Sequence, residues 1–322
     1  MREISYTQGM SEAIQEEMAR DDTVFSIGED IGPVRDPANL WDQFRERRTW
    51  QTPISESGFT GIAVGAAMVG LRPIAVIMYC DFVTVCMDPI VNQAAKVHLM
   101  SGGQFKVPMV IRTPAGAGTR EGGHHSQSLE SWFVHTPGLK VVMPSTPYDA
   151  KGLMKAAIRD DGPVVYIQHR LLHPVTQSVP EGEWIVELGQ ADVKREGTDI
   201  TVVAVSHAVA SALEAAETLE GIVSVEVIDP RSLVPLDVAT ILKSVAKTGR
   251  LLIVHEAPER GGVGAEILRR VAEEGFEHLR AAPRVLGALN TPMPYTAPLE
   301  DACLPLAPNI TQAIRDITGA VA

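Results

Sequence analysis

Residues 52–73 constrain the fold of this chain more than any other stretch. The stretch opens with a Thr-Pro-Ile-Ser turn and one carboxylate, Glu56, and continues as a long apolar run. The run contains small residues at seven positions: Gly58, Gly61, Ala63, Gly65, Ala66, Ala67 and Gly70. It is too long for a strand and predicts a helix, which Ser55 or Ser57 can cap. Because each glycine costs a helix roughly 1 kcal/mol, four of them indicate close approach by another backbone or a flat ligand.

Glu56 at the start of this predicted helix has two interpretations. It is either an ordinary first-turn acid that complements the helix dipole of a core helix, or a carboxylate kept out of bulk water for chemistry. The pattern alone favours the first interpretation.

Length and composition restrict the class of protein. A chain of 322 residues with 45% apolar and 21% charged residues is typical of a globular protein with two domains. The net charge of −12 argues against a nucleic-acid surface, which needs a basic stripe. We expect no membrane span, because Arg72, Pro73 and Asp81 interrupt the most apolar region.

The ends and the cysteines indicate a cytoplasmic protein. The first residues lack the basic segment and apolar core of a signal peptide. An odd number of cysteines without metal-ligand spacing predicts buried thiols in a reducing compartment. These are Cys80, Cys86 and Cys303.

Strands and helices are predicted to alternate along the whole chain. Apolar runs predict strands at 23–27, 73–79, 107–112, 140–143, 163–167, 200–205, 223–228 and 251–255. Periodic segments predict helices that end before 21, lie near 40–44, follow 56, and cover 88–100, 148–159, 207–219, 237–247 and 263–275. This alternation predicts two doubly wound α/β domains. We place them at residues 1–175 and 190–322, with 171–187 as the linker.

The loop at 122–128, Gly-Gly-His-His-Ser-Gln-Ser, has the most reactive composition. Imidazoles suit proton transfer near neutral pH, and glycines let a loop place a ring at a pocket. A hydrolase triad of Ser126 with His125 is not favoured, because adjacent loop residues cannot form that geometry. A metal site on His124 and His125 is not favoured either, because no carboxylate follows them at a helical spacing. Polar groups that only satisfy turn backbones are an equal alternative. Gly261 to Gly264 is only a weak signal for nucleotide binding, and His255-Glu256 at a strand end is ambiguous.

Taken in order, a set of short motifs resembles one known family. They include Gly-Glu-Asp at 28–30, Thr-Pro-Ile-Ser-Glu at 52–56 and His-Ser-Gln-Ser-Leu-Glu at 125–130. Others lie at 65–73, 137–142, 148–152, 227–237, 247–250 and 264–266. Across nearly its whole length the chain resembles the beta subunits of thiamine-diphosphate-dependent 2-oxo acid dehydrogenases of the pyruvate, branched-chain or acetoin type. The resemblance reverses the interpretation of Glu56.

The resemblance implies a pyrimidine-binding domain, then a transketolase C-terminal domain, and it implies site residues. Glu56 would hydrogen-bond the aminopyrimidine ring nitrogen, and Phe82 would stack on that ring. His125 matches the active-site histidine, whereas His124 does not carry over as catalytic. A potassium-like cation would fall on main-chain carbonyls at Met109, Ala157, Ile158, Asp160 and Gly162.

The implied activity is oxidative decarboxylation of a 2-oxo acid, with acyl transfer to a lipoyl acyltransferase core. An acetoin-cleaving enzyme, a split transketolase-like enzyme or a catalytically decayed structural subunit are the alternatives; the presence of both Glu56 and His125 argues against decay. The Gly-Asp-Gly that would hold magnesium and diphosphate in thiamine enzymes is absent from the sequence. We therefore expect an alpha subunit to supply it, in an assembly of two alpha and two beta chains. One departure from the family is the short segment between residues 31 and 51, which lacks the usual double glycine.

Overall fold

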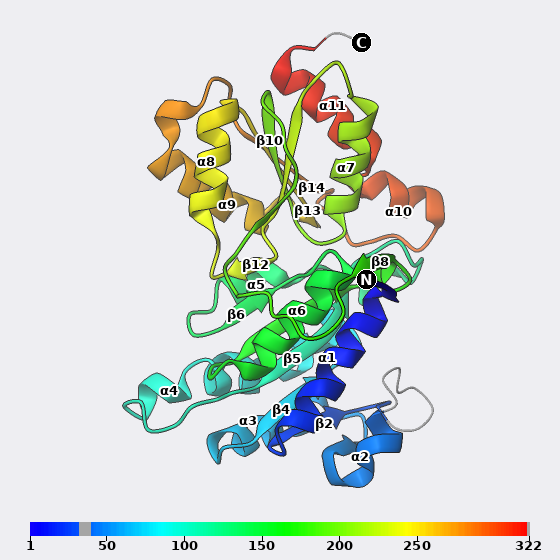
Figure 1. Cartoon of the computed structure of the whole chain (residues 1–322), viewed down its shortest axis with the longest axis vertical. Helices are drawn as coiled ribbons and strands as arrows, with labels where there is room; N and C mark the ends of the chain where they lie inside the picture. Colours follow the sequence, from blue (N-terminus) through cyan, green and yellow to red (C-terminus); the bar gives the residue numbers. More distant parts are fainter. Residues whose placement is uncertain (32–39, 321–322) are drawn as a thin grey trace. The chain divides into compact units, whose positions relative to one another are not determined.

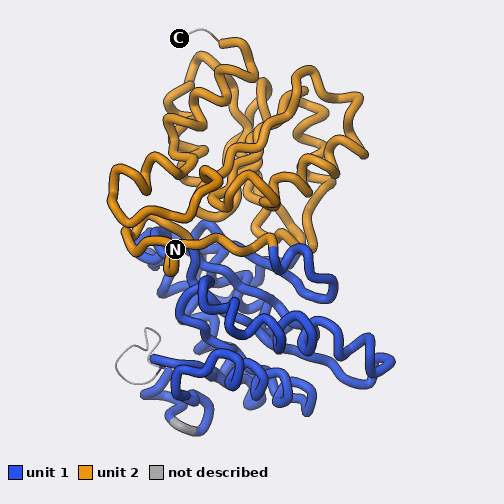
Figure 2. The backbone as a smooth tube through the Cα atoms, turned by 180° about the vertical axis from the view of Figure 1, so that it is seen from behind, with its two compact units in different colours: residues 1–115, 132–188 blue, residues 116–131, 189–322 orange. Residues whose placement is uncertain are grey.

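The computed structural model describes residues 1–31 and 40–320, and these form two compact units (Figures 1 and 2). Unit 1 comprises residues 1–115 and 132–188, and unit 2 comprises residues 116–131 and 189–322. Within the short segment between residues 31 and 51, residues 32–39 lie outside the described residues.

Unit 1 is built on a parallel sheet in which six strands follow the order β6-β7-β5-β4-β2-β3. Consecutive residues of one strand, such as Ile74 and Ala75, are both fully buried. Because consecutive side chains of a strand point to opposite faces, both faces of this sheet are covered. The strands of unit 1 are β1 (Arg2–Ser5), β2 (Val24–Gly28), β3 (Thr49–Gln51), β4 (Arg72–Val76), β5 (Val110–Ala115), β6 (Lys140–Val142), β7 (Val164–His169) and β8 (Thr176–Val179).

Helices α1 and α6 pack together on one face of this sheet, and α3 packs against β4 and β2. The other helical elements are short. The helices of unit 1 are α1 (Tyr6–Arg20), α2 (Leu40–Arg48), α3 (Glu56–Met68), α4 (Val97–Met100) and α6 (Pro147–Arg159), with the 3-10 helices η1 (Cys80–Cys86) and η4 (Arg170–Leu172) and the π-helix η2 (Asp88–Ala94). Helix α5 (Glu130–Val134) contains the boundary between the two units.

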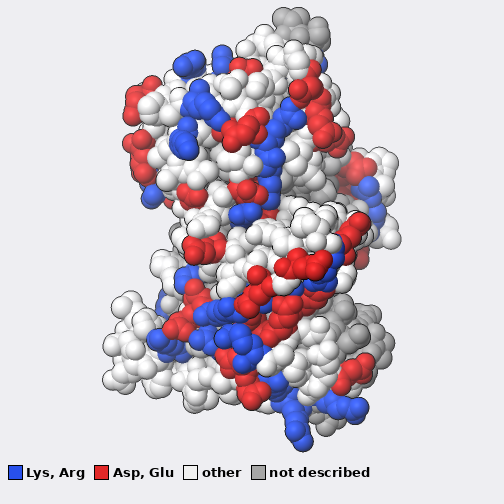
Figure 3. Space-filling model, viewed as in Figure 1, with Lys and Arg blue, Asp and Glu red and all other residues white. Residues whose placement is uncertain are grey.

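Ion pairs link α1 to α6. The Arg159 guanidinium donates two hydrogen bonds of 2.6 and 2.9 Å to the buried Glu17 carboxylate. The buried Lys151 donates to Glu16 at 2.6 Å and to Glu12 at 3.1 Å. On the face seen in Figure 3, acidic and basic side chains are accordingly interleaved over these helices.

Unit 2 has a five-stranded sheet in the order β14-β13-β10-β11-β9, parallel except for β9. Alternate residues of its central strands enter two separate cores. Val202 packs with α7 and α11 on one face, while Val203 packs with α8 and α9 on the other. The elements are β9 (Asp192–Arg195), β10 (Ile200–Ala204), β11 (Val225–Asp229), β12 (Ser232–Val234), β13 (Leu251–Pro258), β14 (Arg284–Ala288), α7 (Ala208–Thr218), α8 (Val238–Thr248), α9 (Val263–Glu274), α10 (Ala297–Cys303) and α11 (Ala307–Thr318), with the 3-10 helices η3 (Gly122–His124) and η5 (Phe276–His278).

The predicted fold class of two doubly wound α/β domains is confirmed. All three cysteines are free and buried, as predicted. No helix of the described residues combines the length and apolar character that crossing a membrane requires.

Two predicted segments differ in detail. The helix predicted over 88–100 is divided into η2 and α4, because the amide of Ala95 bonds the carbonyl of Ile90, five residues back. The Ala95 carbonyl lies against Gly138, where a Cβ would be only 2.0 Å away. The aperiodic segment 171–187 contains β8, which pairs antiparallel with β1.

Candidate active site

Glu56 is the first residue of α3 and its side chain is buried, with 7% of the residue exposed. Ser55 occupies the predicted N-cap position, but its hydroxyl makes no capping hydrogen bond. The unpaired amides of a helix N-terminus stabilise a nearby negative charge. A carboxyl group is therefore held at the helix start in a water-poor environment.

Glu29 provides a second carboxyl group close to the first. It directly follows β2, is 5% exposed, and its Oε2 atom has no hydrogen-bond partner among the described residues. Burial, then the negative charges of Glu56 and Asp30, raise the pKa of Glu29. The parallel pairing of β2 with β3 brings Thr52 to the same edge of the sheet, where the Thr52 amide donates to the Gly28 carbonyl at 2.9 Å. This edge of the sheet therefore carries a buried carboxyl group whose pKa is raised.

The 3-10 helix η1 packs against α3 and carries Phe82, the predicted stacking residue. Its half-buried ring meets Tyr79 edge to face, with ring centroids 5.3 Å apart. Cys86 at the other end of η1 lies beside α3. Burial raises the pKa of the Cys86 thiol to about 11; the Thr60 hydroxyl opposes this shift and the charge of Glu56 adds to it.

His125 lies in unit 2, on residues 116–131, which we call the histidine loop. The loop is folded on itself: the Gly116 amide donates to the Gln127 carbonyl at 3.4 Å, and the His125 amide to the Gly122 carbonyl at 3.3 Å. His125 is half-buried and His124 is exposed. The buried Ser126 hydroxyl has no hydrogen-bond partner within 1–31 and 40–320, so it does not pair with the neighbouring imidazole.

A cavity of about 330 Å³ lies between the histidine loop and the segment that follows β14. Ser126, Ser128 and Glu256 supply polar groups to its wall, and Leu289 and Met293 supply apolar ones. This cavity adjoins the loop that presents His125.

Of the five residues predicted to bind a cation, Met109 directly precedes β5. Ala157 and Ile158 lie in the last turn of α6, and Asp160 and Gly162 follow that helix. The guanidinium of Arg72 donates to the carbonyls of Ile158 and Asp160 at 3.0 and 2.9 Å. The Met109 carbonyl accepts the Val164 amide at 2.9 Å. A carbonyl oxygen has two lone pairs, so these bonds leave one on each for a further ligand. Potassium at this turn stays a prediction.

Sequence reasoning gave no role to Glu29, Glu256 or Glu300. The signal for Glu29 was available, because it follows a buried strand as Gly28-Glu29-Asp30. Glu256 was seen as part of an ambiguous pair at a strand end. Nothing in the local sequence distinguishes Glu300, whose partners are 180 and 182 residues away in the chain.

Known sequence families match both units. Residues 2–175 match the family described as transketolase, pyrimidine binding domain, and residues 189–310 match transketolase, C-terminal domain. The fold is also that of a solved split-gene transketolase described as an inactive beta4 tetramer, with a TM-score of 0.82 at 22% identity over 98% of this chain and 99% of that one. Fold and site together define a transketolase-like protein that contains the pyrimidine-binding half.

Full-length relatives narrow the class. The chain is 43% identical to the beta subunit of acetoin:2,6-dichlorophenolindophenol oxidoreductase from Cupriavidus necator, over 98% of this chain and 97% of the relative. It is 43% identical to a mitochondrial pyruvate dehydrogenase E1 beta subunit of Oryza sativa subsp. japonica, over 98% and 86%. A pyruvate dehydrogenase E1 beta subunit of Rickettsia felis is 42% identical over 98% of each chain. The chain belongs to this family of dehydrogenase beta subunits.

Proposed function

We propose that this chain is the beta subunit of a thiamine-diphosphate-dependent enzyme that decarboxylates a 2-oxo acid and passes the acyl group to a lipoyl acyltransferase. The observation that carries the proposal is the buried Glu56 at the start of α3, beside the buried Glu29, whose pKa is raised, in a unit that matches the pyrimidine-binding family.

The residues at this edge fit an aminopyrimidine ring. Such a ring has nitrogen atoms that accept hydrogen bonds and an amino group that donates them. Recognition of a ring nitrogen requires a carboxyl group that can share a proton with it. The buried Oε2 of Glu29, which lacks a partner among the described residues, shows that this edge holds polar capacity the chain does not use. Phe82, on the element packed against α3, offers an aromatic face.

In this proposal Glu56 binds the ring nitrogen and sets its protonation, and Phe82 fixes the plane of the ring. The cofactor supplies the electron sink that lets a 2-oxo acid lose carbon dioxide. His125 moves protons at the reacting oxygen or at the sulfur of the acyl acceptor, a task that suits an imidazole near neutral pH. Glu29 lies beside Glu56, and the charge of Glu56 contributes to the raised pKa of Glu29.

We also propose that an alpha subunit completes the site. Cradling a diphosphate and its magnesium requires oxygen ligands and donors, and the sequence has no Gly-Asp-Gly to supply them. Two alpha and two beta chains, acting on the acyltransferase core in the cytoplasm, are the proposed assembly. Calorimetric titration of the beta chain alone should show no tight binding of thiamine diphosphate with magnesium, and binding should appear once alpha is added.

Acetoin cleavage is the second candidate, because relatives in Cupriavidus necator and Bacillus subtilis are named for acetoin. An activity panel of pyruvate, branched-chain 2-oxo acids and acetoin, run on the reconstituted pair, separates the two. Glu56→Gln should fold normally and lose about 100- to 10,000-fold in turnover on the preferred substrate. A Glu56→Gln enzyme with near-full turnover would remove the assignment of this residue.

A further inference from the structure

Glu256 is hydrogen-bonded to the histidine loop on both sides of His125. Its Oε1 atom accepts the Ala117 amide at 2.5 Å and faces the Ser128 hydroxyl at 3.5 Å. Ala117 precedes His125 by eight residues and Ser128 follows it by three. One carboxylate therefore ties together the two arms of the loop that presents the imidazole.

Glu300, on α10, holds the same loop from a second side. Its Oε1 atom accepts the Gly118 amide at 2.9 Å, and its Oε2 atom accepts from Arg120 at 2.7 Å. Arg120 also donates to Asp301 at 2.6 Å. Glu300 is fully buried, and a buried carboxylate needs such partners to stay charged.

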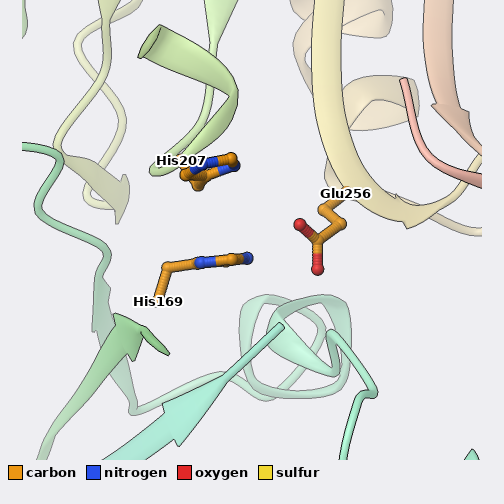
Figure 4. Close-up of side chains that lie close together, drawn as sticks. All are labelled: His169, His207 and Glu256. Atoms are coloured by element: carbon orange, nitrogen blue, oxygen red, sulfur yellow. The ribbon is translucent and has the colours of Figure 1, made fainter. Parts of the chain in front are cut away.

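The β-sheet of unit 2 places Glu256 where a doubly wound fold builds functional sites. Strand β10 has β11 on one side and β13 on the other. The order in which strands are added to the sheet therefore reverses between β10 and β13, which makes this point a topological switch point. His207 follows the carboxyl end of β10, and Glu256 lies near the carboxyl end of β13; Figure 4 shows both side chains, with His169 of unit 1 also labelled. Ligand atoms of His207 and Glu256 lie within 4.8 Å of each other. Crevices at such a switch point are the usual position of sites in open α/β sheets.

The neighbour of Glu256 on β13 is His255, and this part of the strand is irregular. The pairing of β13 with β14 shifts in register between Val254 and Pro258. Within this irregular segment the Nδ1 atom of His255 lies 3.0 Å from the Ala257 carbonyl oxygen. Because a carbonyl oxygen only accepts hydrogen bonds, Nδ1 carries the hydrogen. His255 is fully buried, whereas Glu256 is only half-buried and accepts the Ala117 amide, so the two neighbouring side chains have different surroundings.

We propose that Glu256 and Glu300 are positioning residues for His125: they fix the histidine loop so that the imidazole is held at the reacting groups. The inference rests on the proposed function for its kinetic consequence, but the contacts that carry it lie wholly within unit 2. Misplacing a catalytic group by about 1 Å can cost 100-fold in rate. Loss of the Glu256 carboxylate should therefore reduce turnover through His125.

The test compares Glu256→Ala, Glu256→Gln and His125→Ala, with Glu273→Ala as the matched control. Glu273 is an exposed acid of the same unit, on α9, paired with Arg269 at the surface. Each chain is reconstituted with its alpha subunit, thiamine diphosphate and magnesium. We measure kcat and KM for the preferred 2-oxo acid, and hydrogen exchange of the amides at 117–128.

Glu256→Ala should lower kcat about 10- to 100-fold with KM changed less than threefold, and the Ala117 amide should exchange at least about 10-fold faster. Glu256→Gln should be milder in both readouts, since an amide oxygen still accepts the Ala117 amide. In the His125→Ala background, Glu256→Ala should cause no further loss of kcat, because the two residues act as a unit. Glu273→Ala should match the wild type.

The proposal would be overturned if Glu256→Ala reduced kcat by the same factor in the wild-type and His125→Ala backgrounds. An unchanged exchange rate of the Ala117 amide in Glu256→Ala would also overturn it. If Glu256→Ala does not assemble with the alpha subunit, the same measurements of kcat and amide exchange are made on Glu256→Gln and Ser128→Ala. A wild-type complex inactive on every 2-oxo acid would defeat the proposed function, and the exchange data would then decide the positioning role alone.

Discussion

Acidification should destabilise unit 2 through His255. The imidazole is fully buried, and burial lowers the pKa of His255 to about 4, against an ordinary value of 6.5; the bond to the Ala257 carbonyl opposes this shift only in part. Three glycines, Gly262, Gly264 and Gly287, lie directly against the ring. A Cβ at Gly262 would lie 2.3 Å from its Cε1, and a Cβ at Gly264 would lie 2.8 Å from its Nε2.

The sign and size of the pH effect on stability follow from the difference between the pKa of His255 in the folded and unfolded states. The folded pKa lies below the unfolded one, so the unfolded state binds the proton first as the pH falls. The stabilisation is fully present above pH 6.5 and is lost as the pH falls through about 4. The difference of about 2.5 pKa units, at 1.36 kcal/mol per unit, corresponds to about 3 kcal/mol of unfolding free energy.

The assay has to follow unit 2 specifically. All four tryptophans, at 41, 50, 132 and 184, belong to unit 1, so tryptophan fluorescence does not report on His255. Hydrogen exchange of β10 and β13 amides between pH 7 and 4.5, corrected for intrinsic rates, gives the free energy of opening of the unit 2 core. His255→Asn should be less stable at pH 7 but should lose much less stability on acidification, and His278→Asn, an exposed site, should behave as the wild type. If wild type and His255→Asn lost the same free energy between these pH values, the reasoning would be refuted.

Three further outcomes are expected. His125→Ala should impair the overall reaction with a lipoyl acceptor more than decarboxylation followed with an artificial oxidant, and equal losses would limit the residue to substrate binding. Replacing potassium by a bulky organic cation should lower the melting temperature of unit 1, because an ion held only by the folded turn at 158–162 stabilises it by mass action; an unchanged melting temperature counts against the site. Gly138→Ala should destabilise unit 1 by about 2–4 kcal/mol, since the backbone has φ of +102° and a Cβ would lie 2.0 Å from the Ala95 carbonyl. Gly102→Ala is its control, with φ of +65° and open space around it, and should cost less than half as much in tryptophan-monitored unfolding.

The periodicity of apolar residues was sufficient to predict the fold class, because both units are built from strands that alternate with helices. Fully apolar runs became buried parallel strands, and the small-residue run after Glu56 became α3. Elements that depend on a distant neighbour were not predictable in this way. At the break after Ala94 the Ala95 carbonyl lies against the distant Gly138, and β8 pairs with β1 from the other end of the unit.

The candidate site was predictable only where its residues carry a local pattern. Glu56 begins an unusual helix and His125 lies in a glycine-rich loop, so both were candidates, but only the family resemblance decided in favour of a functional role. The raised pKa of Glu29 depends on the tertiary fold, which buries it and places it near Glu56 across a gap of 27 residues. A carboxylate such as Glu300 has ordinary sequence neighbours, and only the tertiary fold shows that it is buried and bound to a loop.

The histidine loop also has a consequence for the order in which the protein can mature. The bonds from Ala117 to Glu256 and from Gly118 to Glu300 join residues 139 and 182 positions apart. During synthesis the loop leaves the ribosome well before either acid, so its shape cannot be set by its own end of the chain. Contacts of such sequence separation form late, because loop closure must be completed first. Under the proposed function, a nascent chain that has already formed α3 with Glu56 at its start therefore still lacks a positioned His125 until α10 is made.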